Sequence, residues 1–262
     1  MRNFTTLGSL LLASALLSMA HAAPLTLRLN IMNGDKPFTG QLTTSGGQMI
    51  QTTMWQMYIS NVSLVKADGS EVKVKGMNLV KLGEKGPFQN ILAFKADVVP
   101  GKYRGLRFDV GLPRDLNHID ASTQKAPLGV DSGMFWAWNP GYIFSRYEGK
   151  AKVGNQTLEV ALHVGEDRRR MNVDLADMMK PGTIVNVTAK GAQVAVKLDA
   201  QKMVATGVNG GKFDLADNQY VQVHGGAVAD QLYLNLAGAF SLMKGGAESG
   251  MTMKMNMDAK KK

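Results

Sequence analysis

The chain has no cysteine among its 262 residues. This absence excludes disulfide bonds, thiolate metal ligands and a cysteine nucleophile. Long apolar runs are also scarce. The run Leu10–Leu17 is shorter than the roughly 20 residues that a membrane-spanning helix needs, and no later segment is long and apolar enough either. We therefore expect no integral membrane span and a fold that depends on its hydrophobic core alone.

The first 22 residues have the features of a secretory signal. Arg2 is the only charged residue before Arg28, and the apolar run that follows it ends in small residues. This order of a basic end, an apolar stretch and small residues is typical of a cleaved export signal. We expect a signal peptide over residues 1–22, with cleavage after Ala22 favoured over Ala20, and a mature chain that is periplasmic or secreted.

The basic residues outnumber the acidic ones, which gives a formal net charge of +9. They are spread along the chain, apart from Arg168–Arg170 and the terminal Lys260–Lys262. Scattered lysine is typical of a solvated surface, and no stacked-aromatic RNA motif is present, so we expect no nucleic-acid partner. The Gly-x-Ser-x-Gly and His-Glu-x-x-His motifs are also missing. With no credible acid–base pair, we expect a protein that is not an enzyme.

Alternating apolar and polar residues predict a mainly β protein, an antiparallel β-sandwich. A turn at Ala67–Ser70 between two of the alternating segments predicts a hairpin. The expected strands are Leu25–Ile31, Met57–Val65, Glu71–Lys75, Gly101–Val110, Tyr142–Glu148, Leu158–Val164, Thr183–Ala189 and Ala192–Leu198.

Two regions depart from the strand pattern. The segment from Gly111 to about Val130 predicts a long irregular loop, which in a compact domain is usually functional. A four-residue apolar spacing over Ala227–Leu242 predicts a C-terminal amphipathic helix, and Ala176–Met179 a short helical turn. We expect one β-sandwich domain over residues 23–245 and a flexible tail rich in Met and Lys over residues 246–262.

The segment Gly133–Tyr142 carries two of the three tryptophans, Trp136 and Trp138, separated by one residue. In a strand, both indoles would point to the same face and form an apolar platform with two N–H groups. His118 precedes this segment and His163 follows it. Two interpretations remain open from these residues: a sandwich core with a tryptophan pair and incidental histidines, or a soft-metal site.

As metal ligands, His118 and His163 would come from different elements, a loop and a strand. Two imidazoles are too few for a closed structural zinc site, which takes four ligands, so an open site with copper fits better. His224 is a weaker third candidate. The thioethers at every second residue of the tail are soft donors that suit Cu(I), and they add Met251, Met253, Met255 and Met257 as weaker candidates.

A series of segments resembles the MbnP-like family, exported copper-binding proteins related to the methanobactin-associated MbnP. The resemblance extends over about residues 25 to 243, and its most specific block is Gly133–Trp138. The segments that carry it are Phe108–His118, Ala126–Leu128, Gly133–Trp138, Gly141–Phe144 with Arg146, and Leu162–Gly165.

The resemblance implies a β-sandwich protein of the periplasm or outer surface. It implies copper bound by histidines together with a tryptophan that is oxidised to kynurenine, with a dihaem cytochrome c peroxidase-like protein as the oxidising partner. His118 and His163 would then be the favoured ligands, and Trp136 or Trp138 the modified residue. The chain departs from many relatives in lacking cysteine and in carrying the methionine tail.

We therefore expect a periplasmic protein for copper acquisition or handling, with Cu(I) or Cu(II) as its cofactor. The alternative is a non-metal periplasmic binding module, in which the tryptophan pair forms core or a platform for an organic ligand.

Overall fold

The structure is a computed structural model, and it describes residues 21–138, 141–178 and 185–243. Nearly all of the expected signal peptide and the whole methionine tail lie outside these residues. No helix in the described ranges is long and apolar enough to cross a membrane.

The first sheet is built around the N-terminal strand β1, whose side chains alternate between buried and partly exposed. In β1 the buried set includes Leu25, Leu27 and Leu29, so the alternation gives one face to the core. On one side β1 pairs in parallel with β14, which pairs with β16, and on the other it pairs with β7 and β2. The strands are β1 (Ala23–Asn33), β2 (Lys36–Pro37), β7 (Ile91–Val98), β14 (Ala192–Asp199) and β16 (Phe240–Leu242).

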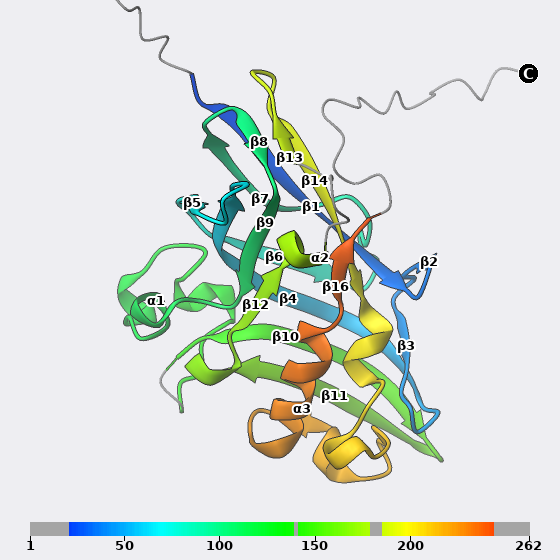
Figure 1. The fold of residues 1–262 in the computed structure, drawn as a ribbon. Helices are drawn as coiled ribbons and strands as arrows, with labels where there is room; N and C mark the ends of the chain where they lie inside the picture. Colours follow the sequence, from blue (N-terminus) through cyan, green and yellow to red (C-terminus); the bar gives the residue numbers. More distant parts are fainter. Residues whose placement is uncertain (1–20, 139–140, 179–184, 244–262) are drawn as a thin grey trace, which may run out of the picture.

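The second sheet is organised by β4, the longest strand, which pairs with five others along its length (Figure 1). The order β12-β9-β4-β10-β11-β15 forms its main path, with β3, β5 and β6 also paired to β4. Its strands are β3 (Gln41–Thr43), β4 (Met49–Val65), β5 (Glu71–Lys73), β6 (Asn78–Gly83), β9 (Gly105–Val110), β10 (Ile143–Val153), β11 (Gln156–Gly165), β12 (Met171–Asp174) and β15 (Gln222–Val223). The short pair β8 (Gly101–Tyr103) and β13 (Val185–Val187) forms a third ladder.

The core lies between the two large sheets and contains side chains from both, such as Leu27 and Val196 from the first and Trp55 and Tyr147 from the second. The helix α3 (Gly226–Ala237) packs on β11 and β12 and buries its apolar stripe there. A smaller core cluster forms under the loop after β9 and includes Trp136.

The fold confirms the mainly β class, the sandwich and the C-terminal helix. The sheets are mixed and not wholly antiparallel, because β1 with β14 and β11 with β15 run parallel. Alternation within a strand shows which face is buried but does not identify the neighbouring strand, so these distant pairings could not be expected. The predicted hairpin is present: Lys66 and Ser70 are joined by a backbone hydrogen bond, and β5 pairs with β4.

The structure corrects three predictions about individual elements. The C-terminal helix ends at Ala237, and Phe240 instead lies in β16, so its place in the four-residue spacing is accidental. The strand expected over Gly101–Val110 is broken at Arg104 into β8 and β9. The expected irregular loop after Gly111 contains short helices: α1 (Arg114–Asn117), η1 (Ala121–Thr123) and η2 (Val130–Ser132).

Further short helices connect the remaining strands. They are η3 (Asp167–Arg169), α2 (Leu175–Met178), η4 (Ala200–Val204), η5 (Val208–Gly210) and η6 (Asn218–Tyr220). The helical turn predicted over Ala176–Met179 corresponds to α2 as far as the structure describes it, and residue 179 lies outside the described ranges. Of the strand expected over Thr183–Ala189, residues 183 and 184 lie outside the described ranges, and β13 ends at Val187, before a turn at Ala189.

Candidate metal-binding site

The parallel pairing of β11 with β15 places two histidines opposite each other. In this register Ala161 pairs with Gln222 and Leu162 with Val223, so the next pair along the strands is His163 and His224. The two imidazole rings have centroids 4.7 Å apart, and their Nδ1 atoms face each other at 3.1 Å. His163 is buried, with 7% of its surface exposed.

Glu148 on β10 determines which nitrogen of the His163 ring carries the hydrogen. Its Oε1 lies 3.2 Å from His163 Nε2. An ionised carboxylate only accepts hydrogen bonds, so His163 Nε2 carries the hydrogen and Nδ1 presents a lone pair toward His224. A carboxylate behind an imidazole is the usual second partner of a metal-binding histidine.

Arg146 links this carboxylate to the tryptophan segment. Its Nε donates to Glu148 Oε1 at 2.8 Å, and its Nη1 donates to the carbonyl oxygen of Gly133 at 2.7 Å. The histidine pair, Glu148 and the tryptophan segment are therefore connected by one chain of hydrogen bonds.

Both histidines favour the neutral form. Burial, together with the neighbouring His224, lowers the pKa of His163 to about 4, although the Glu148 carboxylate acts in the opposite direction. Burial also lowers the pKa of His224, again against the effect of Glu148. At neutral pH the two rings are uncharged, which is the state in which imidazole binds a metal.

The tryptophans lie outside the strands, so the strand geometry that would put both indoles on one face does not apply to them. Gly133 adopts a left-handed conformation, with φ of 70°, and the backbone N–H of Trp136 donates to the Gly141 carbonyl. Trp136 is 5% exposed, whereas Trp138 is 67% exposed. The two indoles are still neighbours, with ring centroids 5.4 Å apart.

The two tryptophans have different neighbours near the histidine pair. Trp136 packs over Gly165, two residues after His163, so closely that an added Cβ at Gly165 would lie 2.5 Å from the indole Cζ3. Its Nε1 is buried and has no hydrogen-bond partner within the described residues. Trp138 lies beside His224, with ring centroids 6.4 Å apart and nearly perpendicular rings.

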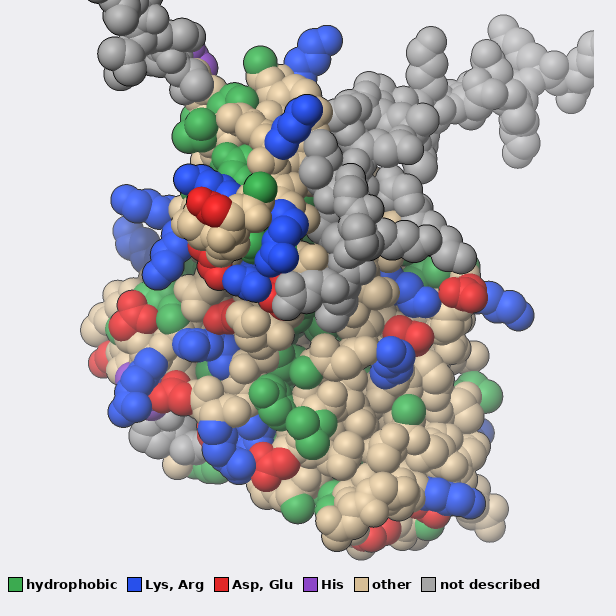
Figure 2. Space-filling view, viewed as in Figure 1, with side chains coloured by type: hydrophobic (Ala, Val, Ile, Leu, Met, Phe, Trp, Pro, Cys, Tyr) green, Lys and Arg blue, Asp and Glu red, His purple; other side chains and the backbone are tan. Residues whose placement is uncertain are grey.

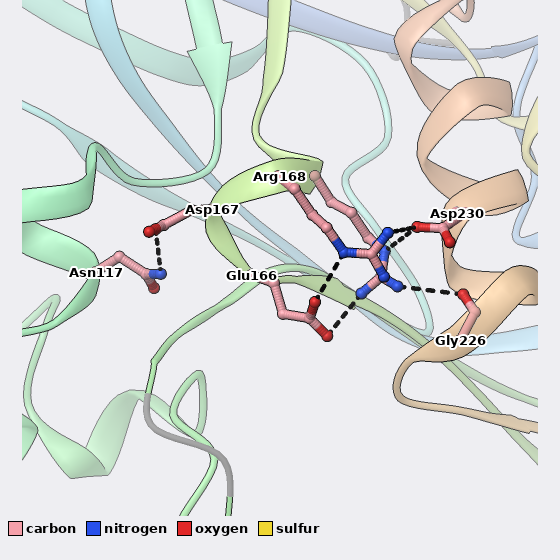
Figure 3. Close-up of polar contacts among 7 residues, drawn as sticks. Asn117, Glu166, Asp167, Arg168, Gly226 and Asp230 are labelled. Carbon is pink, nitrogen blue, oxygen red and sulfur yellow. Dashed lines mark hydrogen bonds and ion pairs between the residues drawn. The ribbon is translucent and has the colours of Figure 1, made fainter.

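His118 belongs to a separate cluster. It follows α1, and its Nε2 lies 2.9 Å from Asp167 Oδ2. Asn117 donates to the other oxygen of Asp167 (Figure 3) and accepts a hydrogen bond from the Tyr142 backbone. No polar or ring contact within the described ranges joins His118 to His163 or His224.

From the sequence we favoured His118 and His163 as the two ligands. In the structure, His163 instead lies beside His224. Glu148 was not predicted, because only the pairing of β10 with β11 brings it near His163. Met251, Met253, Met255 and Met257 lie outside the described residues.

The spacing of the histidine pair allows both rings to bind one metal ion. Metal–imidazole bonds are about 2.0–2.1 Å long, so two nitrogens 3.1 Å apart can bind one ion with an angle of about 100° between them. No group of three or more His, Asp or Glu residues within the described part of the chain could hold a metal. A metal here would thus have two histidines and an open position for another donor.

A polar groove of about 850 Å³ lies away from this site, between β4, β5, β9, β12 and α1. Its lining has as many basic as acidic side chains, and several of them form ion pairs: Arg107 with Glu71 and Asp174, and Arg170 with Asp109. Figure 2 shows acidic and basic side chains interspersed on the visible face of the protein. This charge balance gives the groove no preference for a cation.

Comparison with known proteins identifies the family. The model of the family described as MbnP matches residues 22–227. The solved structure of MbnP from Methylosinus trichosporium is similar, with a TM-score of 0.52 and 17% sequence identity over 79% of this chain and 82% of that chain. No curated protein matches the sequence. Because the family model extends over most of its length, the chain belongs to the MbnP family.

Proposed function

We propose that this protein binds copper in the periplasm and serves copper acquisition or handling, with His163 and His224 as its protein ligands. The observation that carries the proposal is the pair of neutral imidazoles whose Nδ1 atoms face each other at 3.1 Å. Imidazole suits copper, and an open two-histidine site is poor for a structural zinc ion. The likeness to exported copper-binding proteins supports both the metal and the location.

Glu148 would support the site without binding the metal. Its hydrogen bond to His163 Nε2 holds the tautomer whose Nδ1 is free to donate electrons. His118 is the less suitable ligand, because it contacts neither of the two histidines that face each other.

Trp138 is the better candidate for oxidation to kynurenine. It is the exposed indole, so an oxidising protein can reach it, and it lies beside His224. The conversion adds oxygen to the indole, removes one carbon and leaves an aromatic amine and a carbonyl. These groups would supply a donor for the open position, and a dihaem cytochrome c peroxidase-like partner would supply the oxidant.

The first test is thermal unfolding of the purified mature protein with Cu(I), Cu(II), Mg²⁺ or Ca²⁺. A ligand present at about 100 times its Kd stabilises the folded state by about 2.7 kcal/mol. We expect this stabilisation from copper alone, and its loss in His163→Ala and His224→Ala. The matched control is His118→Ala, which should keep it; loss of stabilisation in His118→Ala alone would contradict the assignment.

The second test is the mass of the peptide that contains both tryptophans, from protein made in its native host. Gain of one oxygen with loss of one carbon, located at Trp138 by fragmentation, is the expected result. If host-derived protein has neither copper-dependent stabilisation nor the modification, the alternative gains support. In that alternative, the neighbouring indoles hold an organic ligand, and Trp138→Ala would weaken its binding.

A further inference from the structure

His224 lies in a short connection whose position depends on contacts from elsewhere. It follows β15, a strand of two residues, and precedes α3, which begins at Gly226 with φ of 71°. Glycine in this left-handed conformation gives the connection little stiffness of its own. The position of the His224 ring opposite His163 therefore needs a further restraint.

The neighbouring arginine clasp, defined as Arg169 with Glu166, Asp230 and the Gly226 carbonyl, can provide that restraint. Glu166, Gly226 and Asp230 are labelled in Figure 3. Arg169 Nε donates to Asp230 Oδ1 at 2.7 Å, and Nη2 donates to the Gly226 oxygen at 3.2 Å. Nη1 forms an ion pair with Glu166 Oε1 at 2.8 Å, without hydrogen-bond alignment. The Arg169 side chain is only 1% exposed.

The clasp joins the two chain segments that carry the histidines. Glu166 is three residues after His163, just past the end of β11, and Gly226 is two residues after His224. Glu166 has φ of 71°, a conformation that is costly for a residue other than glycine and is found at constrained sites. The planar guanidinium reaches three acceptors in fixed directions, which a lysine ammonium cannot reproduce.

We propose that Arg169 is a positioning residue that holds His224 opposite His163. It acts through the Gly226 carbonyl and α3 and contacts neither histidine ring. The effect on copper rests on the proposed function, whereas the effect on the two rings does not.

Arg168 offers a matched control. It contacts the same two carboxylates, Asp230 at 2.6 Å and Glu166 at 3.1 Å, but its side chain is 57% exposed. Among the described contacts it has none to Gly226. Arg168→Lys and Arg169→Lys therefore make the same chemical change in adjacent residues, and only the second removes the bond to the connection that carries His224.

The experiment compares these two variants and the wild type in three measurements. In metal-free protein, cross-relaxation between the His163 and His224 ring protons reports their proximity, and hydrogen exchange reports the amides of residues 222–227. Competition titration then gives the Cu(I) affinity. We expect Arg169→Lys to lose ring cross-relaxation, to exchange faster at these amides and to bind Cu(I) about 10–100-fold more weakly. Arg168→Lys should stay within about fivefold of the wild type.

Asp230→Asn provides a second variant if Arg169→Lys does not fold, because Asp230 is partly exposed and the amide keeps its shape. It should reduce the same cross-relaxation while the urea midpoint shows a folded protein. Unchanged ring proximity and exchange in folded Arg169→Lys or Asp230→Asn would overturn the inference. If the wild type binds no copper, the proposed function fails, and the metal-free measurements still decide the role of Arg169.

Discussion

The stability of the metal-free protein should depend on pH through the histidine pair. Burial lowers the pKa of His163 from 6.5 to about 4, so the folded state takes up its proton at lower pH than the unfolded state does. The stabilisation is complete above pH 6.5, and it is lost as the pH falls toward 4. His224, whose pKa is also lowered by burial, contributes in the same direction.

The size of the effect follows from the two pKa values. Each tenfold change in proton affinity corresponds to about 1.4 kcal/mol, so His163 contributes about 3 kcal/mol above pH 6.5. Most of this should be lost by about pH 4.5. That is a large fraction of the stability of an ordinary domain, about 5–15 kcal/mol.

The assay is urea unfolding at pH 7.5 and 4.5 in the presence of a chelator, with His163→Gln as the comparison. Carboxylates that titrate in this range affect both proteins, so the difference between them isolates the histidine. We expect the wild type to lose about 2–3 kcal/mol more than His163→Gln. Equal losses in the two proteins would refute the reasoning.

Three further predictions concern the surroundings of the site. Gly165→Ala should destabilise the fold by about 1–3 kcal/mol in urea unfolding, because its Cβ would press on Trp136. Gly83 has open space around it, so Gly83→Ala should destabilise the fold less. Equal destabilisation by the two substitutions would contradict the packing of Trp136 on Gly165. Glu148→Gln should weaken Cu(I) binding about 10–100-fold in a competition titration, and unchanged affinity would exclude its supporting role. Deletion of residues 246–262 should leave one tightly bound copper per chain; loss of that copper would move the site to the methionines.

The strands were predictable because burial of one face imposes a period of two on the sequence. Leu25–Ile31 shows this directly, and it lies within β1. The partner of a strand is a different matter: β1 pairs with β14, more than 150 residues later, and nothing local in either segment specifies the other. The parallel pairings therefore emerge only from the whole fold.

The candidate site also depends on a pairing between distant strands, so the sequence could indicate its residue types but not their arrangement. The residue types were sufficient to identify histidines and a tryptophan pair, but the spacing could not choose among three histidines. The choice depends on β15, whose two residues are too few to show a period, and on its register with β11. His118 looked suitable because loops carry ligands, yet it belongs to a separate cluster with Asn117 and Asp167.

The most direct measurement is a crystal structure of the copper-loaded protein with anomalous scattering recorded at the copper absorption edge. We expect one strong peak within bonding distance of the Nδ1 atoms of both His163 and His224. A peak at His118 and Asp167, a peak among the tail methionines, or no peak in protein purified from its native host would contradict it.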